Sequence, residues 1–289
     1  MGPVGRELGL EHLSREGFLR LVDFLLEQIP PARVHAGRRM PPPPSGVPVE
    51  LYAYPVFDVP LTGGKHLRCG DGDGVAELEL HPGEVLFSEP FAWKLPLWDR
   101  PHELCCLVFR PECIRITYVD AGSGGRPVCG CFFHTALPPS DTVRKVAGCL
   151  AAAPDEARCD LVRALFRMSR AALAEDQAEL PGKARITYEK IRLHLEENFG
   201  VETDRARVAR LFGLNPGYLS RLFAEHGERG FSETLLEIRM AYAAMLLRET
   251  ELLVDEVAFR CGYRSTTFFS AVFRNCHGMP PGRFRRRFR

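Results

Sequence analysis

Two short stretches near the end of the sequence place polar and basic side chains at the spacing of one helix face. The residues on this face are Gly217, Ser220 and Arg221 in the first stretch and Thr266, Thr267, Ala271 and Arg274 in the second. A guanidinium such as that of Arg221 donates two parallel hydrogen bonds to the acceptor edge of a guanine, while hydroxyl groups donate or accept single hydrogen bonds. These residue types therefore predict recognition of polar edges such as those of base pairs.

Both stretches belong to one unit that occurs twice in the chain. Its residues Val208-Ala209, Gly213, Tyr218-Leu219-Ser220 and Phe223 recur as Val257-Ala258, Gly262, Phe268-Phe269-Ser270 and Phe273. The offset is 49 residues up to the glycine and 50 after it. Such a constant offset with one inserted residue indicates two copies of a supersecondary unit. Each copy predicts a helix, a turn and a second helix.

Local signals support this prediction in the first copy. Gly213 ends the helix predicted over 204–212, because glycine adopts a positive φ at little cost. Asn215 and Pro216 then suit the N-cap and the first position of the next helix, and Ser265 is the matching N-cap in the second copy. The residues predicted to be buried are Tyr218, Leu219, Leu222, Phe223, Phe269, Val272 and Phe273.

A continuous helix is predicted between the copies, over residues 232–249, since this stretch has an apolar face and neither proline nor glycine. At 1.5 Å per residue such a helix is about 27 Å long. It would hold the two reading helices near one duplex turn apart, about 34 Å, so that both enter successive segments of a DNA major groove. The alternative is a helical core with a solvated basic face, but the duplicated unit favours DNA binding.

Further motifs extend the pattern to the end of the chain. Together with the repeated residues they are Ala209-x-x-x-Gly213, Ser220-Arg221-Leu222-Phe223, Gly230-Phe231, Arg239, Gly262-Tyr263, Phe273-Arg274 and Gly278-Met279-Pro280-Pro281-x-x-Phe284-Arg285. With these motifs, residues 184–289 resemble the DNA-binding domain of the AraC/XylS family of bacterial transcription regulators. The resemblance covers about a third of the chain, and it is specific because spacing, repeat and terminal motif agree.

Carried over position by position, the resemblance implies base contacts by Gly217, Ser220, Arg221, Thr266, Thr267 and Ala271. Two positions depart from the family's pattern: Gly217 has no side chain to reach a base, and Ala271 replaces what is frequently a long polar residue. Ala271 still suits contact with a thymine methyl group, and the second helix then contributes more to phosphate positioning and shape readout. The resemblance further implies double-stranded DNA and RNA polymerase as partners.

The charge of the chain divides between its two parts. Residues 184–289 hold 18 Lys and Arg against 13 Asp and Glu, a net formal charge of +5, while the remaining 183 residues hold 20 against 24, a net charge of −4. A basic part joined to an acidic one is typical of a DNA reader with a separate domain. Phosphate contacts are predicted for the final arginines, with a frayed end as the alternative for the last three. These are Arg283, Arg285, Arg286, Arg287 and Arg289.

Composition predicts a two-domain protein of a reducing compartment. The 289 residues, of which 45% are apolar, suffice for two cores. No apolar run reaches the length of a membrane span, and residues 1–17 lack the apolar stretch of a signal peptide. The ten cysteines, including adjacent Cys105-Cys106, are expected to be mostly buried free thiols. We therefore expect a cytoplasmic protein without membrane contact.

The N-terminal part predicts strands rather than helices. After an amphipathic helix over 10–29, the prolines at 30–31 and 41–44 predict an extended connection. Runs at 52–59, 65–69, 75–80, 84–88, 92–97, 102–109, 115–119 and 128–134 then predict a small antiparallel barrel or sandwich. His81-Pro82-Gly83-Glu84-Val85 resembles the turn before a central cupin strand, and the family resemblance also implies a cupin-like sensor here.

The predicted fold class is α+β multidomain, with four parts along the chain. They are an N-terminal helix with a proline-rich connection (1–48), a cupin-like effector-binding domain (49–150), a linker or dimerisation helix (151–183) and an AraC-type DNA-binding domain (184–289). The resemblance implies that a helix here pairs subunits, so Leu161, Leu165 and Met168 of the helix predicted over 155–178 are candidate homodimer contacts, and internal packing is the alternative. Pro181-Gly182 marks the boundary between the domains.

The histidines lack the pattern of a metal-binding cupin, which shows paired histidines one residue apart. His66, His81, His102 and His134 are single, and Cys129-x-Cys131 has no second pair at zinc spacing. We expect no metal, no cofactor and no enzyme activity. A metal-dependent cupin enzyme with an attached DNA-binding domain is the alternative function, and a DNA-binding protein that needs no ligand is a third.

Aromatic and polar residues of the predicted barrel suit a pocket for an organic effector. The candidates are the aromatic residues Tyr52, Phe91, Trp93 and Trp98 and the polar residues Arg68, Glu89, Lys94 and His102. Among them Trp93, Trp98, His102 and Tyr52 are the proposed effector contacts. Because sugars stack on indole rings, a carbohydrate is the first effector class to consider, and packing within the barrel is the alternative role for both tryptophans.

Overall fold

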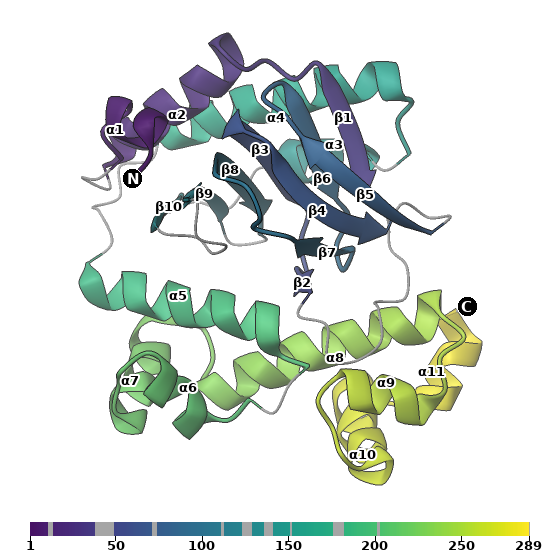
Figure 1. Ribbon diagram of the computed structural model, residues 1–289. Helices are drawn as coiled ribbons and strands as arrows, with labels where there is room; N and C mark the ends of the chain where they lie inside the picture. Colours follow the sequence, from purple (N-terminus) through teal and green to yellow (C-terminus); the bar gives the residue numbers. More distant parts are fainter. Residues whose placement is uncertain are drawn as a thin grey trace. The chain divides into compact units, whose positions relative to one another are not determined.

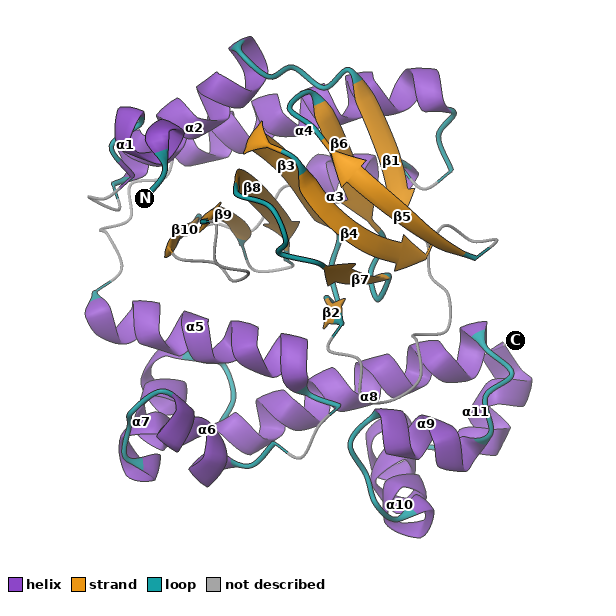
Figure 2. Ribbon diagram, viewed as in Figure 1, coloured by secondary structure: helices purple, strands orange, loops and turns teal. Residues whose placement is uncertain are grey.

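The computed structural model describes residues 1–10, 14–37, 49–70, 74–110, 113–122, 129–135, 141–150, 152–175, 182–200 and 203–288. The chain forms two compact units (Figure 1). The first unit comprises Met1–Arg39 and Tyr54–Leu180, and the second comprises Met40–Ala53 and Pro181–Arg289. The first is β-rich with flanking helices and the second is mainly helical, so the α+β prediction is confirmed at this level (Figure 2).

The described strands of the first unit form two sheets. The larger sheet has the order β1 (Arg33–Gly37), β6 (Glu84–Ser88), β3 (Val56–Gly63), β8 (His102–Phe109), β9 (Ile114–Ala121) and β10 (Cys129–His134). In the other sheet, β4 (Lys65–Gly70) lies between β7 (Trp93–Pro96) and β5 (Val75–Leu80). The short strand β2 (Glu50–Leu51) belongs to the second unit.

Most predicted strands are confirmed, and two features of the sheet differ from the prediction. The strands expected at 75–80, 84–88 and 102–109 have those bounds in β5, β6 and β8. The strand expected at 52–59 begins only at Val56, and the segment after Pro30-Pro31 is a strand, β1, rather than only an extended connection. Because β1 runs parallel to β6, the larger sheet is mixed and not purely antiparallel. Burial of Val34 and Gly37 against the sheet stabilises this additional strand.

The core of the first unit lies between the larger sheet and its helices. These helices are α1 (Pro3–Glu7), α2 (Arg15–Glu27), α3 (Asp141–Cys149) and α4 (Asp155–Glu175). The Phe57 ring packs within 5.2 Å of Phe87 and 5.4 Å of Phe109, measured between ring centroids. Phe18 of α2 and Phe166 of α4 are fully buried in the same cluster. The predicted amphipathic helix is therefore a structural part of this core, through its residues 15–27.

Helix α4 packs inside its own unit. Leu165, one of the three candidate homodimer contacts, is fully buried in the core, and Leu161 and Met168 are partly buried against it. An exposed ion pair between Arg170 and Asp23 joins α4 to α2, with 2.5 Å between Nε and Oδ1. Internal packing thus accounts for Leu165, because a side chain without solvent exposure offers no surface to a second subunit.

The second unit consists of two helix pairs and the helices that hold them. The first pair is α6 (Arg205–Leu211) and α7 (Pro216–His226), and the second is α9 (Val254–Arg260) and α10 (Thr266–His277). Helix α8 (Phe231–Glu249) runs between them, with α5 (Lys183–Asn198) before the first pair and α11 (Pro281–Phe288) after the second.

Arg239 of α8 ties several of these elements together. Its Nε donates a hydrogen bond to the Phe199 carbonyl at 3.0 Å, and its guanidinium lies 5.4 Å from the centre of the Tyr263 ring. Gly262, with φ of +80°, lets the second turn approach this guanidinium, since a Cβ there would come within 2.8 Å of it. Arg239 is thus a structural residue that positions the second helix pair on α8.

Candidate nucleic-acid interface

The first reading helix, α7, begins as its sequence predicts. Gly213 has φ of +65°, the Asn215 side chain accepts a hydrogen bond from the Gly217 amide at 2.7 Å, and Pro216 occupies the first turn. Leu219, Leu222 and Phe223 are at most 1% exposed. This burial fixes which face of α7 turns outward, and it confirms the apolar stripe.

The outward face of α7 presents the predicted residues in different ways. Gly217 and Arg221 are exposed and Ser220 is half-buried. The Arg221 guanidinium lies 5.1 Å from the centre of the Tyr218 ring, and its Nε is 3.9 Å from the Glu225 carboxylate. Tyr218 was predicted to be buried but is only half-buried, because it lies beside the reading face and stacks under Arg221. Tyr218 thereby preorganises the arginine.

Ser220 is held by two hydrogen bonds within the first helix pair. Its hydroxyl donates to the Pro216 carbonyl at 3.1 Å and accepts from Arg205 Nη1 at 3.0 Å. Arg205, at the start of α6, was not among the predicted site residues. It adds an exposed cation that contacts Ser220 of this face. Its place there depends on how α6 packs against α7, which the sequence pattern does not indicate.

The second reading helix, α10, has the same arrangement of N-cap, buried stripe and outward face as α7, with smaller side chains on the outward face. The Ser265 hydroxyl accepts a hydrogen bond from the Phe268 amide at 3.2 Å, as an N-cap should. Phe269 and Phe273 are fully buried, whereas Val272 is half-buried. On the outward side Thr267, Ala271 and Arg274 are exposed and Thr266 is half-buried.

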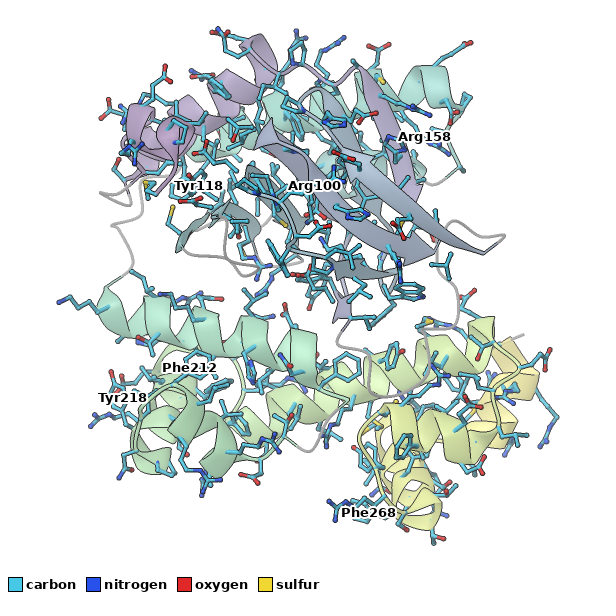
Figure 3. All side chains as sticks on the ribbon, in the orientation of Figure 1. Arg100, Tyr118, Arg158, Phe212, Tyr218 and Phe268 are labelled. Carbon is cyan, nitrogen blue, oxygen red and sulfur yellow. The ribbon has the colours of Figure 1, made fainter. Side chains whose placement is uncertain are left out.

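Phe268 is a feature of this face that the sequence analysis did not single out. It occupies the position of Tyr218 in the repeat, and its side chain is 62% exposed (Figure 3). No arginine is recorded over its ring among the described residues, in contrast to Tyr218. An exposed phenylalanine beside Thr267 offers an apolar contact for a thymine methyl group or a sugar.

The two reading helices lie toward opposite ends of α8 (Figure 1). The 19 residues of α8 span about 28 Å. This helix lacks internal proline and glycine, and Leu246 and Leu247 are fully buried near its end. The length of this well-packed helix is comparable to one turn of duplex DNA, about 34 Å.

The C-terminal arginines belong to helix α11, which continues to Phe288. Up to that residue the end of the chain is helical and not frayed. In α11, Arg283, Arg286 and Arg287 are exposed. Arg285 instead donates a short hydrogen bond to the Leu252 carbonyl, so it connects α11 to the start of the second helix pair. Arg289 lies outside the described residues.

The predicted effector contacts are not gathered in one place. The Trp98 ring stacks on His102 with 5.6 Å between centroids and an interplanar angle of 9°. Trp93 is buried at 2% exposure, and Tyr52 belongs to the second unit. His102 Nδ1 lies 3.0 Å from the Arg100 carbonyl oxygen, and burial lowers the pKa of this histidine. Among the described candidates of the first unit, half-buried Trp98 thus stacks on buried His102.

Between the two sheets lies a buried charge cluster that the sequence analysis missed. Asp58 of β3 accepts hydrogen bonds from Lys65 of β4, at 3.1 Å, and from Lys94 of β7. All three residues are 1% exposed. Burial raises the pKa of Asp58, but the two ammonium groups outweigh this effect and hold it well below its ordinary value. Lys94, a candidate effector contact, is thus part of this structural cluster.

Metal ligands are not grouped in the described part of the chain. No set of three or more His, Cys, Asp or Glu side chains there could hold an ion. His66 instead contacts Asp99 at 2.7 Å and Glu77 at 3.0 Å, and Arg68 pairs with the same Glu77. The side chains of Cys129 and His134 lie outside the described ones.

The described residues also bear on the expected state of the cysteines and on membrane-spanning helices. Each described cysteine is a free thiol, and most are buried, including Cys105 and Cys106. Among the helices that the structure describes, none combines the length and the apolar character needed to span a bilayer.

Known proteins resemble this chain over its C-terminal part or over most of its length. Residues 208–287 match a family described as a helix-turn-helix domain. The chain is 28% identical to the uncharacterized HTH-type transcriptional regulator YpdC of Escherichia coli, over 85% of this chain and 87% of that protein. It is 42% identical to the HTH-type transcriptional regulator GlxA of Rhizobium meliloti, over 29% of this chain and 26% of that protein.

A solved structure also matches about a third of the chain. It is the C-terminal domain of AraT, a response regulator from Geobacillus stearothermophilus. The match has 31% sequence identity and a TM-score of 0.35, and it covers 36% of this chain and 88% of that structure.

Proposed function

We propose that α7 and α10 of this transcription regulator of the AraC/XylS family read the two halves of one bipartite DNA site. The observation that carries this proposal is the pair of outward helix faces in a single compact unit, joined by α8. Each face turns outward because the apolar stripe on the opposite side of the same helix is largely buried.

The two faces have different roles in this proposal. Arg221, preorganised over Tyr218, pairs with a guanine, and Ser220 adds a weaker polar contact. On α10, Thr266 and Thr267 contact base edges, Ala271 contacts a thymine methyl group, and Arg274 neutralises a phosphate. Gly217 permits close approach of the α7 backbone to DNA. The second half-site is then recognised more by shape and apolar contact than the first.

The proposal is tested by selecting bound duplexes from a random DNA pool with the full chain at a fixed salt concentration. We expect an enriched motif with two blocks about one helical turn apart, and a guanine in the block that α7 contacts. Binding that falls uniformly with salt and enriches no motif would leave only nonspecific DNA affinity and would refute the proposal.

A second prediction concerns the arginine tail. Arg287→Ala should weaken binding to all sequences alike and reduce the slope of log K against log salt by about 1, because one phosphate contact is lost. Fluorescence anisotropy titrations at several salt concentrations measure this slope. Arg20→Ala, an exposed arginine of the first unit, serves as the control and should leave the slope unchanged. An unchanged slope in the Arg287 variant would remove α11 from the interface.

The first unit is proposed to bind a small-molecule effector as a cupin-like sensor. Trp98 and His102 support a contact surface for it, and a carbohydrate suits the flat indole. Phe91 and Trp98 have positive φ values of 64° and 41° without being glycine, and such strained positions cluster at ligand sites. A homodimer, RNA polymerase as a partner and a cytoplasmic location complete the proposed regulator.

A further inference from the structure

The first unit contains a pocket at the open edge between its two sheets. Strand β1 is the outermost strand of the larger sheet, and β5 is the outermost strand of the other. The pocket lies between them with a volume of about 450 Å³, and the first turns of α4 form a further wall. Small-molecule sites commonly have volumes of about 300–1,000 Å³.

The walls of this pocket combine apolar surface with a few charged groups. Its apolar lining comes from Ala32, Val34, Ala36, Ala76 and Leu78, together with the thiols of Cys69 and Cys159. The polar lining comes from Arg33, His35, Asp155 and Arg158. His35 and Arg33 both lie near Glu84, at 3.3 and 3.9 Å, so this carboxylate partly neutralises that side of the pocket.

Arg158 is the group best placed to bind a ligand. It is only 8% exposed, and Figure 3 labels it beside β1. Its Nε donates a hydrogen bond to the Leu150 carbonyl at 3.2 Å, and its Nη1 donates to Asp155 at 2.5 Å. These bonds fix the plane of the guanidinium. Within the described part of the chain no acceptor is recorded for Nη2, the remaining nitrogen.

The neutralising partner of Arg158 is itself weakly held. The Asp155 side chain is 88% exposed, and exposed ion pairs contribute about 0–1 kcal/mol. A largely buried guanidinium with one nitrogen free to donate, on the wall of a cavity that has both polar and apolar lining, favours an organic anion that carries an apolar body. A carboxylate oxygen accepts a strong, charge-assisted hydrogen bond from such a nitrogen.

We infer that this pocket binds a small organic monocarboxylate, with its carboxylate on Arg158 and its apolar body against Val34, Ala76 and Leu78. This site is distinct from the Trp98–His102 surface. Its ligand would contact the first turns of α4, the helix that precedes the second unit along the chain. A regulatory effect of the ligand rests on the proposed function, whereas its binding does not.

The binding test uses isothermal titration calorimetry on the full chain without DNA. The probes are hexanoate, cyclohexanecarboxylate and phenylacetate, each compared with its primary amide, and inorganic phosphate. We expect at least one carboxylate to bind about tenfold or more tightly than its amide, because a hydrogen bond to a charged group is lost in the amide. Arg158→Gln should weaken that carboxylate by about tenfold or more.

Two further variants keep this test decisive if Arg158→Gln folds poorly. Ala76→Leu adds atoms to the pocket wall without removing a charge, and it should abolish binding. Arg167→Gln removes an exposed arginine of the same helix that does not line the pocket, and this variant should bind normally. Equal binding of acid and amide, no binding of any carboxylate, binding of phosphate alone, or full binding by Ala76→Leu would each overturn the inference.

The regulatory part is measured separately on a duplex that the selection experiment has enriched. The carboxylate should shift the DNA affinity of the wild-type chain and not that of Ala76→Leu. Calorimetric binding with no such shift would refute regulation through α4 and leave the site itself established. Failure to enrich any duplex would refute the proposed function without affecting the calorimetric result.

Discussion

Asp58→Ala is expected to lower the free energy of unfolding of the first unit by about 3–5 kcal/mol, the cost of breaking a buried ion pair by removing one partner. Asp58 is the carboxylate between Lys65 and Lys94, and all three side chains are almost inaccessible to water. Removing it leaves the buried ammonium groups of Lys65 and Lys94 without this carboxylate. Urea unfolding followed by tryptophan fluorescence measures the loss, since both tryptophans lie in this part of the chain.

The exposed pair of Asp23 and Arg170 supplies the control for this prediction. Asp23→Ala removes a carboxylate at 2.5 Å from an arginine, but solvent screens this pair and the loss should be about 0–1 kcal/mol. Replacing Asp58, Lys65 and Lys94 together by Leu, Met and Met should recover much of the lost stability, because no buried charge then remains. Equal effects of Asp58→Ala and Asp23→Ala would contradict the structural role of the cluster.

The same cluster predicts a pH dependence. Because the folded protein holds the pKa of Asp58 below its ordinary value, its contribution is fully present above the unfolded-state pKa, about 3.9. It decreases only as the pH falls from there through the folded-state pKa. The difference in unfolding free energy between wild type and Asp58→Asn should therefore stay constant from pH 7 to about pH 5. It should shrink as the pH falls below the ordinary pKa of an aspartate.

Arg221→Ala is the second large expected effect, and it concerns DNA rather than folding. Specific binding should weaken by about 1–3 kcal/mol, and the preference at one base position should relax. The side chain is 64% exposed, so its removal should leave the stability of the second unit nearly unchanged. Competition titrations with duplexes that differ at single positions identify the affected base.

Arg221→Lys separates base recognition from charge. A lysine keeps the positive charge but lacks the planar fork that pairs with guanine. It should therefore retain nonspecific affinity and salt dependence while losing the base preference. If Arg221→Ala weakens binding equally on all sequences, Arg221 contacts phosphate, and the assigned role is wrong.

Local signals in the sequence predicted the parts of the structure that depend on neighbours in the chain. The glycine at 213, the N-caps Asn215 and Ser265 and the stripe of Leu219 and Phe223 all act within one or two helical turns. The outward faces of α7 and α10 follow from the same stripes. Tyr218 was misassigned because helical spacing alone does not distinguish a core residue from one that flanks a face.

Long-range pairings could not be predicted in this way. Strand β1 is stabilised by parallel pairing with β6, whose residues lie 51 positions later in the chain, and residues 33–37 alone show little alternation. The Asp58 cluster joins residues 58, 65 and 94, whose proximity depends on how the two sheets face each other. Arg158 was likewise treated only as part of a linker helix, because its pocket requires β1 and β5.

The central claim is that one subunit reads two major-groove segments through helices held apart by α8. It is tested most directly by inserting five base pairs between the two blocks of a selected site and measuring the affinity of the full chain by anisotropy. Five base pairs are about half a helical turn, so the second block moves to the far face of the duplex. A loss of tenfold or more, about 1.4 kcal/mol, together with an Arg221 contact that persists in the first block, is the predicted result. Unchanged affinity would contradict the claim that α8 holds α7 and α10 at a fixed separation.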